Sequence, residues 1–152
     1  MRVVILALML LSMLRADENV VKVVFDLTTG DLKNFERKLL SGIAVHKTHY
    51  EGMLKELEVA VVIHGGAYKF FVKDPKHPHL DKEKELREAH ATLSKRIASM
   101  ADTYDVKFLI CRSGMQVKKL KKEDIYDFVE IIRTSTIGLI DKQNEGFAYI
   151  PI

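Results

Sequence analysis

The sequence predicts an α/β fold, a three-layer α/β/α sandwich built on a mostly parallel five-stranded sheet. Segments with strand character alternate with segments of helical periodicity along the chain, which is the pattern of a parallel sheet with crossover helices. The strand segments are also apolar on both faces, as in sheets that are covered on both sides. The chain has 152 residues, a length that suits one domain with a substantial core.

Residues 1–16 have the layout of a secretory signal peptide. Arg2 gives a positive start, residues 3–14 are almost entirely apolar, and Ala16 is a small residue at a plausible cleavage point. At about 1.5 Å per residue the apolar run would span roughly 18 Å, well short of the ~30 Å hydrocarbon core. We therefore expect a single mature domain at 17–152, periplasmic or secreted, with no membrane attachment after signal cleavage.

The net charge gives no reason to expect a nucleic-acid partner. The full chain has 24 basic and 21 acidic residues, but the mature domain loses Arg2 and Arg15 and is nearly neutral. A near-neutral domain lacks the field that attracts nucleic acid. The lysine-rich run at 118–122 lacks an aromatic platform for bases and is typical of a solvated helix face.

The first half of the chain is predicted to form two strands joined by a helix. Residues 20–27 are a β-branched run typical of a strand. Apolar residues then recur at helical spacing over 32–54, with a possible interruption at 41–42. Residues 57–64 form a second apolar run, which two glycines end.

The middle of the chain contains the clearest helix and the third strand. Residues 67–72 are ambiguous between a continued strand and a short helix, whereas the prolines within 73–79 indicate a loop. An apolar stripe with early glutamates predicts a helix over 82–104, with Asp81 as its cap. Residues 106–111 are predicted to form the third strand, which has the most buried character.

The last third continues the alternation. We expect a short helix at 114–121, a fourth strand at 128–132, a helix at 134–144 and a fifth strand at 147–150 that Pro151 closes.

The carboxyl ends of the strands are the expected binding edge, because ligands of open α/β sheets bind there. The strand predictions bring 28–30, 64–66, 111–113 and 133–135 to that edge. The glycine turns in the first two segments could bind an anion through backbone N–H groups, but neither matches a nucleotide-binding motif. We interpret them as turns and expect no cofactor.

Cys111 is the only cysteine and ends the third predicted strand. The start of a helix and positive charge from Arg112 and the following lysines would favour its thiolate, the nucleophilic form. The alternative is a small apolar residue that finishes a buried strand, and position alone does not decide between them. A lone cysteine cannot perform dithiol chemistry within one chain, so any reaction requires a partner or a small thiol.

His64 ends the second predicted strand and could reach the same edge. It could take the thiol proton or orient an anion, although a histidine that binds a loop is the more common arrangement. Two histidine pairs have spacings that metal ligands can show, but no acidic or cysteine partner completes either set, so we expect no metal. These pairs are His46 with His49 and His77 with His79.

Four segments, taken in order, resemble the DsrE/DsrF-like sulfur-relay family, which includes TusD-like and YchN-like proteins. They are 59–66, 106–111, 128–132 and 144–151. The resemblance implies a three-layer α/β domain that commonly forms homo-oligomers. In sulfur-transferring members it also implies a persulfide-carrying cysteine at the end of the third strand, the position of Cys111. The predicted export departs from the usual cytoplasmic location of sulfur-relay members.

The expected function is that of an exported DsrE-like protein that handles sulfur, as a sulfurtransferase or a sulfur carrier. Cys111 would carry the persulfide, Arg112 and the helix start would stabilise the anion, and His64 would assist. Partners would be further copies of the chain and sulfur donor and acceptor proteins or small thiols. The alternative is a non-catalytic oligomeric module that binds a small ligand or a protein, with Cys111 structural.

Overall fold

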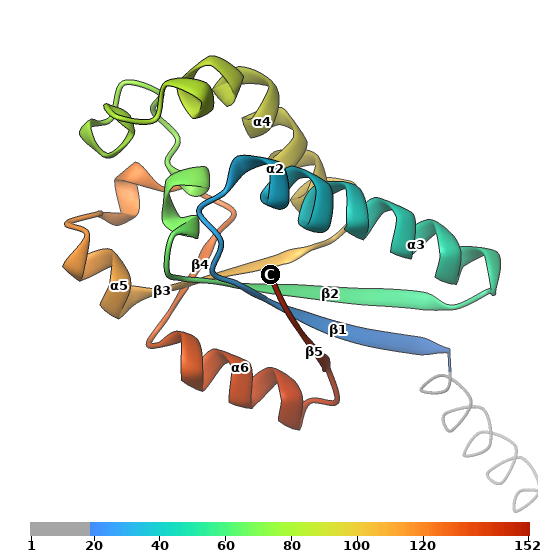
Figure 1. The fold of residues 1–152 in the computed structure, drawn as a ribbon. Coiled ribbons are helices and arrows are strands. Elements are labelled where there is room, and N and C mark those ends of the chain that lie inside the picture. Colours follow the sequence, from blue (N-terminus) through green and yellow to red (C-terminus); the bar gives the residue numbers. More distant parts are fainter. Residues whose placement is uncertain (1–18) are drawn as a thin grey trace, which may run out of the picture.

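Five parallel strands form one sheet in the order β4-β3-β2-β1-β5 in the computed structural model, which describes residues 19–152 (Figure 1). The predicted signal segment 1–16 lies outside the described residues. The strands are β1 (Val20–Leu27), β2 (Glu56–Ile63), β3 (Lys107–Cys111), β4 (Glu130–Ile132) and β5 (Ala148–Pro151). The predicted α/β class and five-stranded sheet are confirmed, and every strand pair is parallel.

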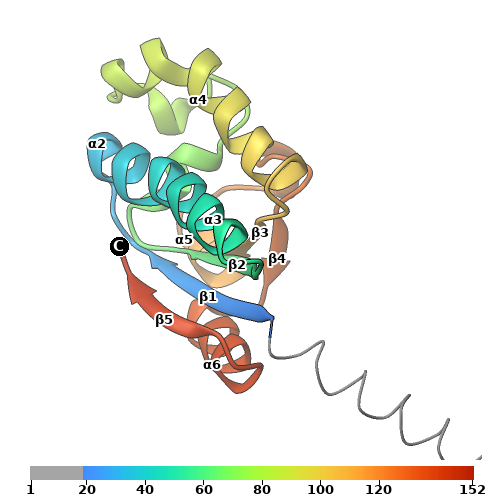
Figure 2. The same cartoon turned by 90° about the vertical axis from the view of Figure 1, so that its right-hand side faces the viewer.

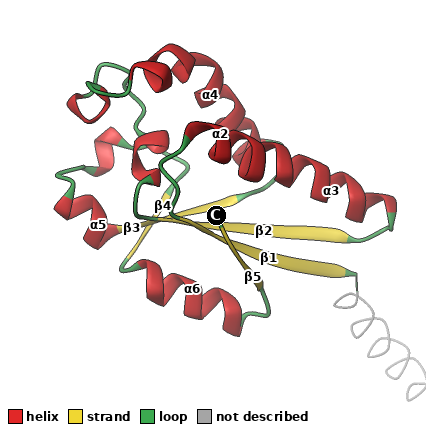
Figure 3. Ribbon diagram, viewed as in Figure 1, coloured by secondary structure: helices red, strands yellow, loops and turns green. Residues whose placement is uncertain are grey.

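Helices cover both faces of the sheet (Figure 3). The α-helices are α2 (Leu32–Asn34), α3 (Gly42–Gly52), α4 (Lys84–Asp102), α5 (Arg112–Val117) and α6 (Ser135–Asn144). A π-helical segment, Phe35–Ser41, joins α2 to α3, and 3-10 turns occupy Ala67–Phe71, Pro78–Leu80 and Lys122–Asp124. Within residues 19–152 no helix combines the length and the apolar character needed to cross a membrane.

The direction of winding decides which helix covers which face. β1 to β4 succeed one another in one direction across the sheet, and right-handed crossovers therefore place α2, α3 and α4 on one face. The chain then returns past β1 to form β5, which places α6 on the opposite face (Figure 2). As a result, α6 is the only described helix on its side, and it begins where β4 ends.

The two faces carry cores of different size. The larger core lies under α2 to α4, where Phe35 stacks on Phe70 with ring centroids 4.3 Å apart and meets Phe71 edge-on. The smaller core lies under α6. Its buried residues are Val24, Ala60, Val62, Leu109 and Phe147. Alternation along β1 and β2 separates these two sets, as the two-residue period of a strand requires.

The structure settles one open alternative and revises two local predictions. The segment 67–72 resolves as a 3-10 turn, which buries Tyr68. The start of α4 is at Lys84, with Glu83 at the cap position and no side-chain cap, so the prediction of Asp81 as the cap is wrong. Asp81 instead follows the preceding 3-10 turn. Finally, α5 starts at Arg112, directly after the third strand, rather than at residue 114.

The glycine turns after β1 and β2 pack backbone against backbone. A Cβ on Gly66 would lie 2.8 Å from the Gly30 nitrogen and 2.9 Å from its Cα. The Gly66 N–H donates to the Thr28 carbonyl at 2.9 Å. The Gly66 N–H is therefore used within the fold, which agrees with the interpretation of these segments as turns.

We predict that Gly66→Ala destabilises the protein by about 1–3 kcal/mol, because the added methyl must displace backbone rather than a flexible side chain. The measurement is the urea unfolding midpoint. Gly52→Ala is the matched control, since nothing lies within 4 Å of its Cβ position and it ends α3. The control is expected to be neutral or stabilising by up to about 1 kcal/mol. Equal midpoints for the two variants would contradict the close-packing explanation.

Candidate functional site

Cys111 lies where β3 passes into α5. It is the last residue of the strand and the N-cap residue of the helix, with φ −71° and ψ 116°. The residue is 6% exposed. Its carbonyl accepts a hydrogen bond of 2.9 Å from the Tyr68 hydroxyl. The strand, the helix start and the 3-10 turn after β2 thus meet at this one residue.

The pKa of the Cys111 thiol is lowered despite its burial. Burial is the largest single influence and raises the pKa, because it disfavours the charged form. Four hydrogen-bond donors together outweigh it: the Gly114 N–H, the Tyr68 hydroxyl, and the N–H groups of Ser135 and Ser113. The site therefore favours the thiolate, which is the nucleophilic form of cysteine.

The backbone donors come from the first turns of two helices. Ser113 and Gly114 belong to α5, and Ser135 is the first residue of α6. The Ser113 hydroxyl donates to the Arg133 carbonyl at 3.3 Å, which ties the two helix starts together. Thr134 caps α6 by accepting from the Ile137 N–H at 3.2 Å. Unpaired N–H groups and the helix dipole both favour an anion at such a position.

Tyr68 is the residue of this site that the sequence did not reveal. It is 2% exposed, and burial, followed by its contact with Cys111, raises the pKa of its hydroxyl, which therefore stays protonated as a donor. A Cβ on Gly114 would lie 1.8 Å from the Tyr68 oxygen, so only glycine leaves room for it. The Lys118 ammonium lies 5.5 Å from the centre of the Tyr68 ring. The segment 67–72 has no periodicity that would have indicated this role.

Arg112 and His64 are the other two residues that the sequence predicted for the site. The Arg112 side chain is exposed and lines a shallow surface pocket beside β4 together with Lys122 and Asp127. The pKa of the thiol is lowered by the hydrogen-bond donors described above, and neither Arg112 nor His64 is among them. The His64 Nε2 lies 2.5 Å from the Asp26 Oδ1. The roles predicted for both residues stay predictions.

The remaining histidines do not assemble into a metal centre. His77 Nε2 is 3.6 Å from the Asp124 carboxylate, and the His79 N–H donates to His77 Nδ1 at 3.2 Å. Burial, followed by the charges of His77 and Lys118, lowers the pKa of His79. Across residues 19–152 no group of three or more histidine, cysteine or acidic side chains is arranged to hold a metal ion.

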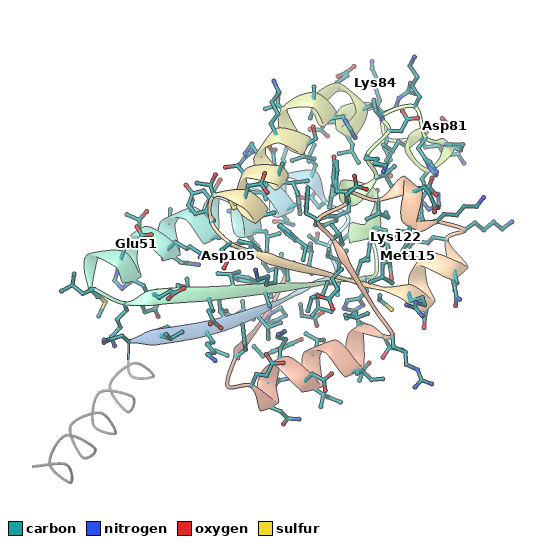
Figure 4. All side chains as sticks on the ribbon, turned by 180° about the vertical axis from the view of Figure 1, so that it is seen from behind. Glu51, Asp81, Lys84, Asp105, Met115 and Lys122 are labelled. Atoms are coloured by element: carbon teal, nitrogen blue, oxygen red, sulfur yellow. The ribbon has the colours of Figure 1, made fainter. Side chains whose placement is uncertain are left out.

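The fold and the site together define a class of protein: a parallel α/β domain that presents one thiol at the carboxyl edge of its sheet, against the starts of two helices. Figure 4 shows this end of the molecule, where the labelled Met115 marks α5 next to the sheet. The thiol position and the strand order agree with the family resemblance seen in the sequence.

The chain belongs to the DsrE/DsrF-like family, whose model matches residues 10–152. An uncharacterized protein of Aquifex aeolicus is 31% identical over 133 residues, which cover 86% of this chain and 55% of that protein. The chain thus spans about half the length of this relative. A solved structure of a protein of unknown function from Methanobacterium thermoautotrophicum has a TM-score of 0.61 at 17% identity and covers 87% of this chain and 99% of that one. This likeness shows a shared fold.

We predict that Tyr68→Phe raises the pKa of the Cys111 thiol, because it removes the hydroxyl that lies beside both the thiol and the Cys111 carbonyl. The thiolate fraction near neutral pH should fall, and alkylation by iodoacetamide should slow in proportion. A thiolate absorbance titration measures the pKa directly.

Tyr126→Phe is the matched control for this experiment. Burial raises the pKa of Tyr126 to about 12, and the residue makes its hydrogen bond with Ser94, away from the thiol. The control should leave the thiol titration unchanged. A Tyr68→Phe protein that titrates like the unmodified chain would show that Tyr68 only fills space.

Proposed function

We propose that this chain is an exported DsrE-like protein that handles sulfur through Cys111. The thiolate accepts a sulfane sulfur atom, holds it as a persulfide and passes it to an acceptor. The observation that supports this most directly is the arrangement of hydrogen-bond donors from two helix starts and Tyr68 around a 6% exposed thiol, which lowers its pKa despite its burial. A buried cysteine that only filled space would have a raised pKa.

The loading step needs no oxidant or reductant. The Cys111 thiolate attacks the outer sulfur of a persulfide donor, a new bond forms between Sγ and that sulfur, and the sulfur–sulfur bond of the donor breaks. The electron pair of the broken bond leaves with the donor thiolate. Delivery repeats the same exchange with an acceptor thiolate attacking the outer sulfur, and Cys111 leaves as the thiolate.

A single thiol requires separate donor and acceptor molecules. Cys111 is the only cysteine of the chain, so no second thiol of the same chain can resolve its persulfide as a disulfide. The proposed partners are therefore sulfur donor and acceptor proteins or small thiols, in the manner of TusD-like and YchN-like members. Export through residues 1–16 would place this chemistry in the periplasm or outside the cell.

Self-association is part of the proposal. β5 is an edge strand whose four residues are all exposed, and Tyr149 and Ile150 are 44% and 41% exposed. Exposed edge strands with apolar side chains are usually covered, often by another chain. We propose that a second copy of the protein covers this edge.

One observation favours the alternative of a non-catalytic module with a structural cysteine. At 6% exposure the thiol offers little surface to a reactant, as a core cysteine would. Labelling of the folded protein separates the two functions, because a carrier thiol must react without unfolding.

We predict that the folded mature protein, incubated with glutathione persulfide, gains the mass of one sulfur atom on Cys111. The persulfide should form because the hydrogen-bond donors around Cys111 favour its thiolate. Intact mass spectrometry without reductant measures the gain, and a reducing agent should reverse it. Cys111→Ser is the matched control and should gain nothing.

Two results would count against the carrier. One is a folded protein that iodoacetamide alkylates but that gains no sulfur, which would show a reactive thiol with another role. The other is a thiol that reacts only after unfolding, which would favour the structural cysteine.

A further inference from the structure

Three polar side chains form a hydrogen-bonded row at the carboxyl edge of the sheet. The Tyr149 hydroxyl donates to Asp26 Oδ2 at 2.7 Å, and the Asp26 Oδ1 lies 2.5 Å from His64 Nε2. The side chains of Asp26 and His64 are only 13% and 27% exposed. The three residues belong to β5, β1 and the end of β2, which are consecutive in the sheet.

Strand register places Cys111 next to this row. Val62 on β2 lies opposite Leu109 on β3, and both side chains pack in the core under α6. The next residues after the paired Ile63 and Ile110 are His64 and Cys111, which lie at the same level of adjacent strands. Cys111 also packs with the larger core, while the Ser135 N–H of α6 reaches its thiol from the other face. Neighbouring strands are about 4.8 Å apart. Tyr149, Asp26, His64 and Cys111 thus follow one another across four adjacent strands, β5-β1-β2-β3.

The hydrogen bonds decide the tautomer of His64. An ionised carboxylate can only accept hydrogen bonds, so a proton on Nε2 points at Asp26. Asp26 also accepts the Tyr149 proton, and this hydrogen bond is the main cause of the raised pKa of the Tyr149 hydroxyl. In neutral His64 the Nδ1 is then the unprotonated nitrogen, the one able to accept a proton.

We propose that Asp26 and Tyr149 position His64 as the acid–base group of the Cys111 thiol. The His64 Nδ1 takes the proton of the Cys111 thiol and becomes an imidazolium that the Asp26 carboxylate stabilises. It returns this proton to the thiolate that departs when sulfur is loaded. Asp26 and Tyr149 are positioning residues, since they act through His64. This role in sulfur exchange rests on the proposed function, whereas the coupling of His64 to the thiol does not.

The contrasting explanation is that the row only fastens the edge strand to the sheet. Tyr149 lies on β5, which pairs only with β1, and a hydrogen bond to Asp26 would help to hold it. A fastening role predicts that substitutions lower the melting temperature and leave the chemistry of the thiol unchanged. A positioning role predicts a change in the pH profile of the thiol.

The experiment is the rate of Cys111 alkylation by iodoacetamide as a function of pH, without any sulfur donor. His64→Gln should slow the reaction near neutral pH by about tenfold or more, the low end of what a positioned acid–base group contributes. Asp26→Asn should also slow it, because a neutral amide stabilises the imidazolium less than a carboxylate does and can donate to Nε2, which favours the other tautomer. Tyr149→Phe should give a smaller loss in the same direction.

A second readout uses the unmodified protein, so that it does not depend on variants that fold. Nitrogen-15 NMR of the His64 ring should show the proton on Nε2, and alkylation of Cys111 should shift the ring signals. His49→Gln and Asp102→Asn are matched controls, since both side chains are exposed and distant from the row. Profiles of His64→Gln and Asp26→Asn that equal those of the controls would overturn the proposal.

The outcome is distinguishable from that of the sulfur-loading experiment. If His64→Gln changes the pH profile but the protein gains no sulfur, the acid–base pair is supported and the carrier function is contradicted. If the protein gains sulfur and His64→Gln leaves the pH profile unchanged, the carrier function is supported and the acid–base pair is contradicted.

Discussion

The parallel register between β1 and β2 is the constraint on which the rest of the molecule depends. It runs without a break over eight residue pairs, from Val20 opposite Glu56 to Leu27 opposite Ile63. A slip of one residue would turn every side chain of one strand to the opposite face. Phe25 and Val61 would then leave the large core, and Asp26 would point away from His64. The same register that fills the core therefore also assembles the polar row at the edge.

The reversal of winding after β4 supplies the second half of the site. Had the chain continued past β4, its last helix would lie on the face of α4, and the thiol would have only the first turn of α5 beside it. The return to β1 instead starts α6 next to the end of β3. This brings the Ser135 N–H to Cys111. As a consequence, that face of the sheet is covered by one described helix over a small core.

The strands and the place of the cysteine were predictable because their signals are local. Runs such as 20–27 and 106–111 consist mainly of β-branched and other apolar residues, interrupted by Lys22, Asp26 and Lys107, and the end of such a run is visible in the sequence. The start of α5 at Arg112 was not visible, because the cap geometry at Cys111 depends on the strand before it.

Long-range partners explain what the sequence could not show. Tyr68 is 43 positions from Cys111 and lies in a segment without periodicity. Asp26 sits inside a β-branched run and finds its partner 38 positions away. The sequence predicted both the start of the following helix and the charge of Arg112 as stabilisers of the thiolate. In the folded chain the lowered pKa comes from the N–H groups of two helix starts and from the Tyr68 hydroxyl, and the share of α6 and Tyr68 depends on contacts that no local pattern reveals.

The hydrogen-bond donors around Cys111 and the side chain of His64 suit the unloaded and the loaded state of the proposed carrier, respectively. In the unloaded state the charge lies on Sγ, where the donors of α5, α6 and Tyr68 meet it. Loading adds a sulfur about 2 Å beyond Sγ, and the ionised persulfide carries its charge mainly on that outer atom. The charge therefore moves away from the buried donors. In the proposed site His64, which lies at the same level of the next strand and whose side chain is 27% exposed, would meet this charge. A carrier thiol must be ionised before loading, which a buried set of hydrogen-bond donors favours. Once loaded, its outer sulfur must be reachable, which a more exposed proton carrier serves. The ends of adjacent strands provide both.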